Sequence, residues 1–297
     1  MIELSKINEY NSYLINIRKL SDNTAYSYMG DVKRFTSFLE KNGILNFENV
    51  TKNDIINFLA ALEENGMSRQ SLARYTSSIN IFYNWLKDMG MIADNPASDV
   101  QMTENKTKLP TVLSSKEINK LLETPDLSDL KGIRDKAMLE TLYATGLRVT
   151  ELISLDVSDV NLVTSLITCR GKTVRTIPVY PKAAKALRDY LETSRMYIAQ
   201  PSETALFVNI AGVRMTRQGF WKKVKYYTRL AGITNDITPR ILRHSFAAHL
   251  LESGADINVL REMLGHSAIA TTQKYARVVK KKLKDVYFSS HPRASAQ

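Results

Sequence analysis

The sequence predicts a mainly α-helical protein with one small β-hairpin, divided into two domains. Apolar residues recur at steps of three and four along most of the 297 residues, which is the period of an amphipathic helix. One stretch, 165–180, instead contains two short strand-like runs on either side of a glycine, which is typical of a hairpin. The helical period stops between 94 and 112, and a chain of this length exceeds the usual size of one domain.

Four helices are predicted in the first hundred residues. Each carries an apolar stripe, and the last three begin at a residue that favours the N-cap and end near a glycine. Their limits are Leu4 and Ile17, Ser21 or Asp22 and Gly43, Thr51 or Asn53 and Gly66, and Ser68 and Gly90. Four helices with short connections predict a small bundle over residues 1–94.

A linker is predicted over residues 95–112. It contains Asn95-Pro96, a polar stretch with Lys106 and Lys108, and Leu109-Pro110, and none of these fits a helical stripe. We expect this segment to be extended and exposed, and we expect the second domain to span residues 113–297.

Helices resume in the second domain. They are expected to start at Ser114 or Ser115, to run from Asp129 to Ala144 and from Pro181 to Arg195, and to continue toward the tail with breaks at Gly232, Gly254 and Gly265. The hairpin is expected to pair 166–170 with 173–179 around Gly171-Lys172. Residues 206–208 are expected to form a short strand or a buried loop.

Composition excludes several classes of protein. With 44% apolar and 24% charged residues, the chain has the composition of a folded protein. A single cysteine, Cys169, excludes a disulfide framework and a thiolate zinc cluster. No run approaches eighteen apolar residues, and the first twenty residues mix charges into the apolar pattern, which argues against a membrane partner and a signal peptide. We therefore expect a cytoplasmic protein.

The positive charge of the chain is concentrated in its later part. The formal net charge is +11, of which residues 1–100 contribute −2 and the remainder +13. Such an asymmetry favours an anionic partner that the second domain contacts more closely. A solvated basic surface would explain the same charge, so charge alone does not decide between them.

Reactive side chains are concentrated in three segments of the second domain. Arg148 follows a glycine at which a helix is expected to end. Arg240 and Arg243 share a face of one helix start, where Thr238 suits the N-cap and backbone N–H groups are free, which is typical of a phosphate site. The segments are Thr145–Leu152, Thr238–Phe246, and Leu264–His266 with Tyr275 nine residues further on.

Each of these features has an ordinary explanation when it is taken alone. A single arginine is usually a surface or ion-pair residue, and one tyrosine among 14 usually belongs to packing. Gly171-Lys172-Thr173 is similar to the end of a phosphate-binding loop, but Leu166 stands where the first glycine should be, which excludes a nucleotide site. The four histidines form no close pair beside carboxylates, so no metal site is expected.

In combination, the motifs resemble the tyrosine recombinase (phage integrase) family, and most closely its Xer-type site-specific recombinases. The resemblance runs nearly from end to end, and several separate motifs follow the order of the family. They are Asn95-Pro96-Ala97, Leu109-Pro110, Ala144-Thr145-Gly146-Leu147-Arg148, Leu242-Arg243-His244-Ser245-Phe246-Ala247, Leu264-Gly265-His266-Ser267, Thr271-Thr272-Gln273-Lys274-Tyr275 and His291-Pro292-Arg293-Ala294. The resemblance implies an N-terminal SAM-like bundle that binds core DNA and an α-rich catalytic domain.

The resemblance also implies an enzyme that cleaves and rejoins DNA strands without a metal, nucleotide or other cofactor. In the family, a tyrosine attacks a DNA phosphate and leaves a 3′-phosphotyrosyl link with a free 5′-hydroxyl. Tyr275 matches this nucleophile, and Arg148 and Arg243 match two arginines that hold the phosphate oxygens, a task that suits planar guanidinium groups. Lys172 matches the lysine that protonates the leaving oxygen. His266 matches a histidine that bonds the scissile phosphate.

Two further positions belong to the implied site. Glu151 matches an accessory acidic position that orients an arginine. Arg240 stands where the family usually has a histidine, or a lysine, that accepts the tyrosine proton, and arginine cannot act as a base near neutral pH. His244 faces about 100° round the helix from Arg243, which makes it a doubtful substitute. A natural active variant, a weakened enzyme and an introduced change that stalls cleavage are the alternatives, and our hypothesis is intact DNA binding with slowed cleavage.

Cationic and polar side chains outside the site are expected to contact the DNA. In the bundle they are expected in or near the major groove, and in the second domain they are expected to contact phosphates. They are Lys33, Arg34, Arg69, Gln70, Arg74, Tyr75, Lys222, Lys223 and Lys225. Solvated helix faces would explain any one of them equally well.

The family resemblance further implies partners and a task. A C-terminal interaction helix, with the basic run 280–284 followed by apolar residues, would be exchanged within a homo- or hetero-tetramer on paired DNA sites. A second recombinase or a DNA translocase is a further implied partner. The resemblance also implies that the protein is associated with the nucleoid. The tasks that fit are resolution of chromosome or plasmid dimers during chromosome partition, mobile-element integration, DNA binding without catalysis, and nicking and closing of DNA.

Overall fold

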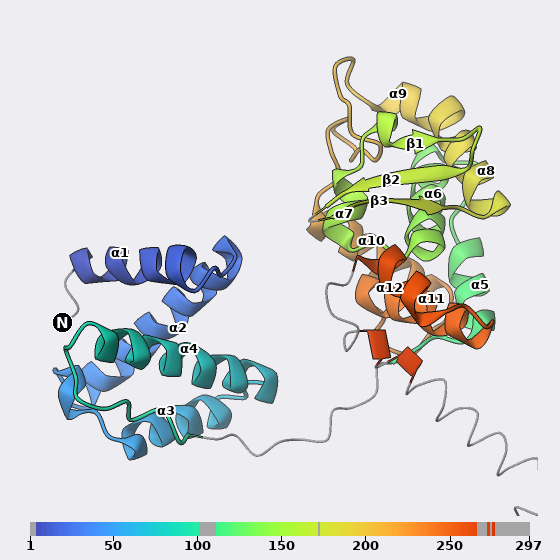
Figure 1. Cartoon of the computed structure of the whole chain (residues 1–297). Helices are drawn as coiled ribbons and strands as arrows, with labels where there is room; N and C mark the ends of the chain where they lie inside the picture. Colours follow the sequence, from blue (N-terminus) through green and yellow to red (C-terminus); the bar gives the residue numbers. More distant parts are fainter. Residues whose placement is uncertain (1–3, 101–110, 172, 266–271, 274, 277–297) are drawn as a thin grey trace, which may run out of the picture. The chain divides into compact units, whose positions relative to one another are not determined.

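The computed structural model describes residues 4–100, 111–171, 173–265, 272–273 and 275–276. The chain divides into two compact units, Met1–Lys106 and Thr107–Gln297 (Figure 1). Each unit has its own hydrophobic core. The domain limits predicted from the sequence, 1–94 and 113–297, stay predictions. Within the described ranges, no helix is long and apolar enough to cross a membrane.

The first unit is a helical bundle, as the sequence predicts. Its elements are α1 (Leu4–Ser12), the π-helical turn η1 (Tyr13–Ile17), α2 (Asp22–Lys41), the 3-10 turn η2 (Phe47–Asn49), α3 (Lys52–Glu64) and α4 (Arg69–Asp88). The predicted caps are present, because the side chains of Ser21, Thr51 and Ser68 each accept a hydrogen bond from the backbone N–H three residues on. Local sequence therefore sets where these helices begin.

Aromatic side chains fill the core of the first unit. Tyr10 packs edge-on against Phe82, with 5.1 Å between ring centroids. Phe58 contacts Phe35 at 5.1 Å and Tyr75 at 5.6 Å. Because α2 and α4 pack against each other along this core, the two longest helices of the bundle form its frame (Figure 1).

Residues 95–100 do not form the exposed, extended start of a linker that the sequence predicts. Ala97 is only 2% exposed and belongs to the bundle core. The side-chain amide of Asn95 donates hydrogen bonds to the Oδ1 atoms of Asn80 and Asn84, at 2.7 and 2.9 Å, which ties this segment to α4. The prediction was wrong here because the loss of helical period marks the end of a helix and not the end of packing. Lys106 and Lys108 lie outside the described residues.

The second unit is mainly helical, with one small sheet (Figure 1). Its helical elements are α5 (Ser115–Glu123), α6 (Leu130–Thr145), α7 (Val149–Ser154), η3 (Val157–Asp159), α8 (Pro181–Tyr190), the π-helical turn η4 (Leu191–Arg195), α9 (Met196–Ile198), α10 (Arg217–Leu230), α11 (Pro239–Glu252) and α12 (Ile257–Leu264). The helix starts at Ser115, Leu130 and Pro181 agree with the sequence prediction to within one or two residues.

The sheet contains the predicted hairpin and one strand more. Strands β1 (Val160–Asn161), β2 (Leu166–Arg170) and β3 (Val174–Pro178) pair antiparallel in that order, with Cys169 opposite Arg175. β1 has two residues, which is too short to give a period in the sequence. Residues 206–208 are fully buried and form a loop with one isolated bridge, from Val208 to Arg214, so the loop alternative was correct.

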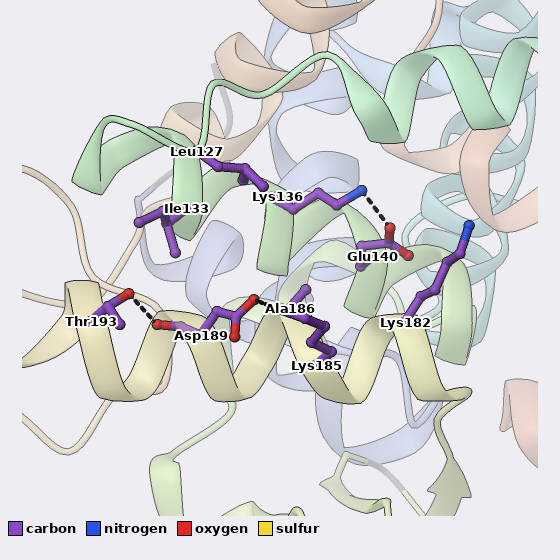
Figure 2. Close-up of a pocket in the computed structure, with 9 residues that line it drawn as sticks. All are labelled: Leu127, Ile133, Lys136, Glu140, Lys182, Lys185, Ala186, Asp189 and Thr193. Atoms are coloured by element: carbon purple, nitrogen blue, oxygen red, sulfur yellow. Dashed lines mark hydrogen bonds and ion pairs between the residues drawn. The ribbon is translucent and has the colours of Figure 1, made fainter.

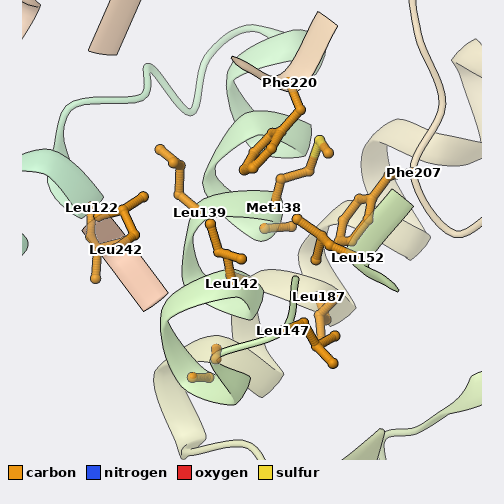
Figure 3. Close-up of a cluster of buried hydrophobic side chains, with 14 of the residues drawn as sticks. Leu122, Met138, Leu139, Leu142, Leu147, Leu152, Leu187, Phe207, Phe220 and Leu242 are labelled. Carbon is orange, nitrogen blue, oxygen red and sulfur yellow. The ribbon is translucent and has the colours of Figure 1, made fainter. Parts of the chain in front are cut away.

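The core of the second unit surrounds α6. Met138, Leu139 and Leu142 are fully buried and pack among apolar side chains of α7, α8, α10 and α11 (Figure 3). α6 is buried along most of its length, and it buries the charged side chains of Arg134, Asp135 and Glu140 as well as apolar ones. The first segment with reactive side chains, Thr145–Leu152, begins at the C-terminal end of α6.

Candidate functional site

A left-handed glycine ends α6 and starts the site. Gly146 has φ +59°, and a Cβ on it would lie 2.3 Å from Cδ1 of Phe246, so only glycine fits there. The chain turns sharply and Arg148 becomes the N-cap of α7, with its side chain 46% exposed. The sequence analysis placed Arg148 just after a helix that ends at a glycine, and the structure confirms that position.

Arg243 lies in the interior beside Arg148 and joins three segments. It sits in the first turns of α11, with a side chain only 8% exposed. Its guanidinium donates hydrogen bonds to the backbone carbonyls of Gly146 and Leu264, the latter at 2.7 Å. Burial, together with the nearby charge of Arg148, lowers the pKa of Arg243 to about 10. The protein therefore holds two like charges close together, an arrangement that favours an anion between them.

Glu151 is the carboxylate around which the arginines gather. It accepts from the backbone N–H of Arg148 at 2.7 Å and from Arg148 Nη1 at 3.1 Å. It receives a two-pronged contact from Arg175, at 3.0 and 3.1 Å, and Arg243 Nη1 lies 3.7 Å away. Burial acts to raise the pKa of Glu151, but the hydrogen bonds from Arg175 and the Arg148 backbone outweigh it and hold that pKa below its usual range.

Arg175 is a site residue that the sequence analysis missed. It lies on the buried face of β3, donates from Nε to the carbonyl of Met263 at 2.7 Å, and covers Gly265 so closely that a Cβ there would lie 2.9 Å from its Nη1. The available signal was its place in the hairpin, since residues 175 and 177 alternate inward. An arginine at an inward strand position needs a buried partner, and here that partner is Glu151.

Tyr275 is buried at the centre of a small apolar cluster. It is 1% exposed and packs with Phe246, Leu260 and Leu264. Its Oη lies 2.7 Å from Nδ1 of His244. Burial raises the pKa of the phenol, while the positive charges of Arg243, Arg240 and Arg148 act to lower it, in that order of strength. The predicted nucleophile thus lies within the electrostatic reach of all three predicted arginines.

His244 contacts Tyr275 directly, although helical geometry made it a doubtful partner. His244 and Arg243 point in different directions from α11, but Tyr275 packs against the side of the helix on which His244 lies. Arg240 lies one turn earlier and is exposed, and its Nε donates to Nε2 of His244 at 3.2 Å. The position that departs from the family pattern is therefore connected to the tyrosine through a histidine.

Two predicted site residues, Lys172 and His266, lie outside the described residues. Their neighbours in the chain are close to the site. A Cβ on Gly171 would lie 3.0 Å from Oε1 of Glu151, so the hairpin turn approaches this carboxylate. The carbonyl of Gly265 accepts from Arg148 Nη2 at 3.3 Å.

The predicted DNA-contact residues differ in their surroundings. Lys33, Arg34, Arg69, Gln70 and Lys222 are exposed, as a contact residue must be. The other four, which are described next, take part in packing or ion pairs of their own unit.

Tyr75 is 5% exposed, so the prediction that it contacts DNA was wrong: it continues the apolar stripe of α4. Arg74 is half-buried, and its Nη1 lies 2.5 Å from Oδ1 of Asp31, so it forms an ion pair within the first unit. In the second unit, Lys223 lies 3.0 Å from Asp135, and Lys225 pairs with Asp236.

A surface pocket between α6 and α8 lies away from these residues. Lys136 bridges to Glu140 at 2.7 Å along one side of it, and Lys185 bridges to Asp189 at 2.6 Å along the other (Figure 2). None of the predicted site residues lines it. In the described parts of the chain, no group of three or more histidine, cysteine or acidic side chains could hold a metal ion.

The arrangement is suited to binding a phosphate and stabilising added negative charge on it. Three guanidinium groups surround one carboxylate, so the site retains an excess of positive charge. The donors are held by carbonyls and by Glu151, and they need no rearrangement when an anion arrives. A phenol that three positive charges influence lies beside them.

Two family models match the chain. The phage integrase family model covers residues 111–282, and the model of the phage integrase N-terminal SAM-like domain covers residues 7–90. The chain is 42% identical to "Tyrosine recombinase XerD" of Oceanobacillus iheyensis over 293 residues, which is 97% of this chain and 98% of the relative. It is 41% identical to the protein of the same name in Listeria monocytogenes, over 97% of this chain and 99% of the relative.

Solved structures with the same fold include further recombinases. A crystal structure of XerA recombinase is 27% identical, with a TM-score of 0.56 over 98% of this chain and 99% of that one. XerH site-specific recombinase bound to a palindromic difH substrate is 20% identical, with a TM-score of 0.75 over 95% of this chain and 84% of that one. Family models, relatives and fold agree, and the chain belongs to the phage integrase family as a Xer-type tyrosine recombinase.

Proposed function

We propose that this site-specific recombinase cuts DNA with Tyr275 while Arg148 and Arg243 hold the scissile phosphate. The observation that carries the proposal is the clustering of three arginines around Glu151, next to a buried phenol on which Arg243, Arg240 and Arg148 act. Guanidinium groups suit this task because they stay charged and present paired donors to phosphate oxygens.

The cleavage step is a transfer of the phosphoryl group to the tyrosine. The oxygen of Tyr275 forms a bond to phosphorus, and the bond between phosphorus and the 5′ oxygen breaks. The leaving oxygen takes a proton from Lys172, and the phenol proton is released to the solvent. Arg240 cannot accept that proton near neutral pH. Arg148 and Arg243 stabilise the extra negative charge on the five-coordinate phosphorus.

Glu151 and His266 complete the proposed site. Glu151 orients the arginines, and the contacts that support this role are its hydrogen bonds with Arg148 and Arg175. His266 bonds a phosphate oxygen in this proposal, and its neighbour Gly265 supplies a carbonyl to Arg148.

A duplex recombination site is the proposed partner, and resolution of chromosome or plasmid dimers is the proposed task. The solved neighbours include XerH bound to its difH substrate, which supports a DNA partner. We propose assembly as a tetramer on two sites, through the C-terminal helix of the sequence analysis, whose residues lie outside the described ones. Deleting residues after Val279 is expected to abolish pairing of two sites and to leave binding to one site intact. Recombination by the purified chain alone would count against a required second recombinase or translocase.

Covalent trapping on DNA tests the proposed chemistry. Genomic fragments that the protein protects are selected first, and a nick beside the cleavage position then prevents rejoining. We expect a protein–DNA adduct that survives SDS, and we expect Tyr275→Phe to form none while it binds the same DNA equally well. An adduct formed by the Phe variant, or the lack of any adduct with the unaltered chain on protected DNA, would overturn the proposal.

A further inference from the structure

We propose that His244 is a further catalytic residue, which donates a hydrogen bond from Nδ1 to the attacking oxygen of Tyr275, and that Arg240 is the positioning residue that fixes its tautomer. The proposal rests on the function proposed above, because it takes Tyr275 as the nucleophile. It assigns separate tasks to two residues, one of which departs from the family pattern.

The contact between His244 and Tyr275 is short and buried. Nδ1 and Oη are 2.7 Å apart, the two ring centroids are 5.3 Å apart, and both side chains are less than a tenth exposed. His244 is fixed on the fourteen-residue helix α11, and Tyr275 packs against Phe246 of the same helix. Both groups are therefore held in position before DNA binds.

The contact with Arg240 determines which nitrogen of His244 carries the proton. The guanidinium has donors and no acceptor, so the N–H of Arg240 Nε, 3.2 Å from Nε2, must meet a lone pair there. A neutral imidazole whose Nε2 is an acceptor carries its one proton on Nδ1. The Nδ1–H group then points to Oη of Tyr275 and donates to it.

This tautomer makes His244 a hydrogen-bond donor and not a base. A second proton would have to go onto Nε2, the atom that accepts the N–H of Arg240, so protonation of His244 would break that hydrogen bond. The phenol proton passes to water, as in the cleavage step above. As negative charge develops on Oη, the bond from Nδ1 becomes charge-assisted and strengthens, which is the condition for a contact to accelerate the step.

Among the residues that the structure describes, the charged groups that act on Tyr275 include Arg243, Arg240 and Arg148. They stabilise its negative form at longer range, whereas His244 contacts the reacting oxygen itself. This assignment also gives Arg240 a function that a histidine would not supply in the same way. Arginine at this position cannot take the proton, but its Nε–H donates to Nε2 of His244 and holds that histidine in one tautomer.

Nuclear magnetic resonance on the unaltered protein tests the tautomer. The chain has four histidines, so ¹⁵N-labelled imidazole signals can be assigned with a His244→Asn variant. We expect the His244 ring to carry its proton on Nδ1 at neutral pH, and we expect Arg240→Met to shift it toward the other tautomer. A protonated Nε2 in the unaltered protein would overturn the proposal. This measurement requires neither DNA nor catalysis.

Trapping kinetics test the donor. Asparagine can place an amide N–H near the position of Nδ1 but cannot act as a base, whereas alanine offers neither. We expect His244→Ala to slow adduct formation by about 10- to 100-fold, the usual worth of a hydrogen bond to a charged group, and to shift the rise of rate with pH to more alkaline values. His244→Asn should recover most of the rate, and His249→Asn, on the same helix, is the matched control.

The outcomes separate the two proposals. If the unaltered chain forms no adduct, the proposed function fails and the kinetics say nothing against the tautomer, which the resonance measurement decides. If it forms an adduct but His244→Asn is as slow as His244→Ala, then His244 acts as a base and the donor role is wrong. If both variants cleave at the unaltered rate, His244 has no part in the reaction. Thermal unfolding of each variant shows whether α11 remains folded.

Discussion

The two units bury different kinds of side chain. Among the residues that the structure describes, the first unit has an apolar and aromatic interior with one buried acid, Asp31, held by Arg74. The second unit buries several charged side chains: Arg134, Asp135, Glu140, Asp159, Arg175 and Arg243. Burial of a charge is unfavourable unless a partner compensates it, so the second unit gives up stability to hold its charges in place.

The two units therefore offer different kinds of cationic side chain to an anion. In the first unit, Lys33, Arg34 and Arg69 are exposed and can adapt to a surface. In the second, Arg243 is fixed by two carbonyls, and Glu151 fixes Arg148 and Arg175. Fixed cations suit chemistry because they do not reorganise during the reaction, whereas exposed cations suit binding. The following predictions test that contrast, from the largest expected effect to the smallest.

Tyr275→Phe is expected to have the largest effect. The variant lacks the attacking oxygen, so formation of a covalent DNA adduct should fall to background. Binding to the protected DNA should remain, because the arginine cluster and the bundle are unchanged. An adduct assay measures cleavage, and a gel-shift assay on the same DNA fragment measures binding. A parallel loss of binding would mean that the tyrosine supports the fold and not the chemistry.

Arg243→Lys tests whether the second unit needs fixed, forked donors. Lysine keeps a positive charge but cannot reach the carbonyls of Gly146 and Leu264 and the phosphate together. We expect cleavage to slow by about 100- to 1,000-fold, as for loss of a transition-state donor. Arg188→Lys, on the exposed face of α8, is the control and should leave the rate unchanged. Equal rates for both variants would show that charge alone suffices.

Arg175→Met tests the cost of the buried charges. The change leaves Glu151 without its two-pronged partner, and breaking a buried pair costs about 3–5 kcal/mol of unfolding free energy. The pKa of Glu151 is lowered in the folded protein, so its contribution to stability is present above its usual pKa and is lost as the pH falls through the lowered value. The difference in free energy of unfolding between Arg175→Met and the unaltered protein should therefore become smaller at acid pH. Urea unfolding at several pH values measures this difference. A difference that does not change with pH would contradict the pairing of Arg175 with ionised Glu151.

The first unit should respond differently to its buried and exposed residues. Tyr75→Ala removes a core ring and should cost about 3–5 kcal/mol of stability, as for other buried aromatic side chains. Arg69→Ala should leave stability nearly unchanged and should reduce the slope of log K against log salt for DNA binding by about 1 if Arg69 contacts one phosphate. An unchanged slope would remove Arg69 from the interface.

Much of the fold follows from local sequence. Thr51 and Ser114 each form a capping box with the acid three residues on, so the helix starts were predictable from short-range chemistry. The hairpin was predictable for the same reason. The packing of Asn95 against Asn80 and Asn84 was not, because it depends on contacts between segments rather than on a period.

The candidate site was predictable only in part. Arg148, Arg243 and Tyr275 lie in motifs with their own signals, and the structure brings them together. Arg175 and His244 make contacts across the fold, to Glu151 and Tyr275, that no spacing along the chain encodes. Their roles require the tertiary structure.

The identity of the residue that becomes attached to DNA is the most direct test of the account. After trapping on a nicked site and digestion of protein and DNA, mass spectrometry locates the nucleotide on the peptide chain. We predict a 3′-phosphate linked to Tyr275, in an amount that falls with Arg243→Lys. Attachment to any other residue, or a 5′-phosphate link at Tyr275, would contradict the account.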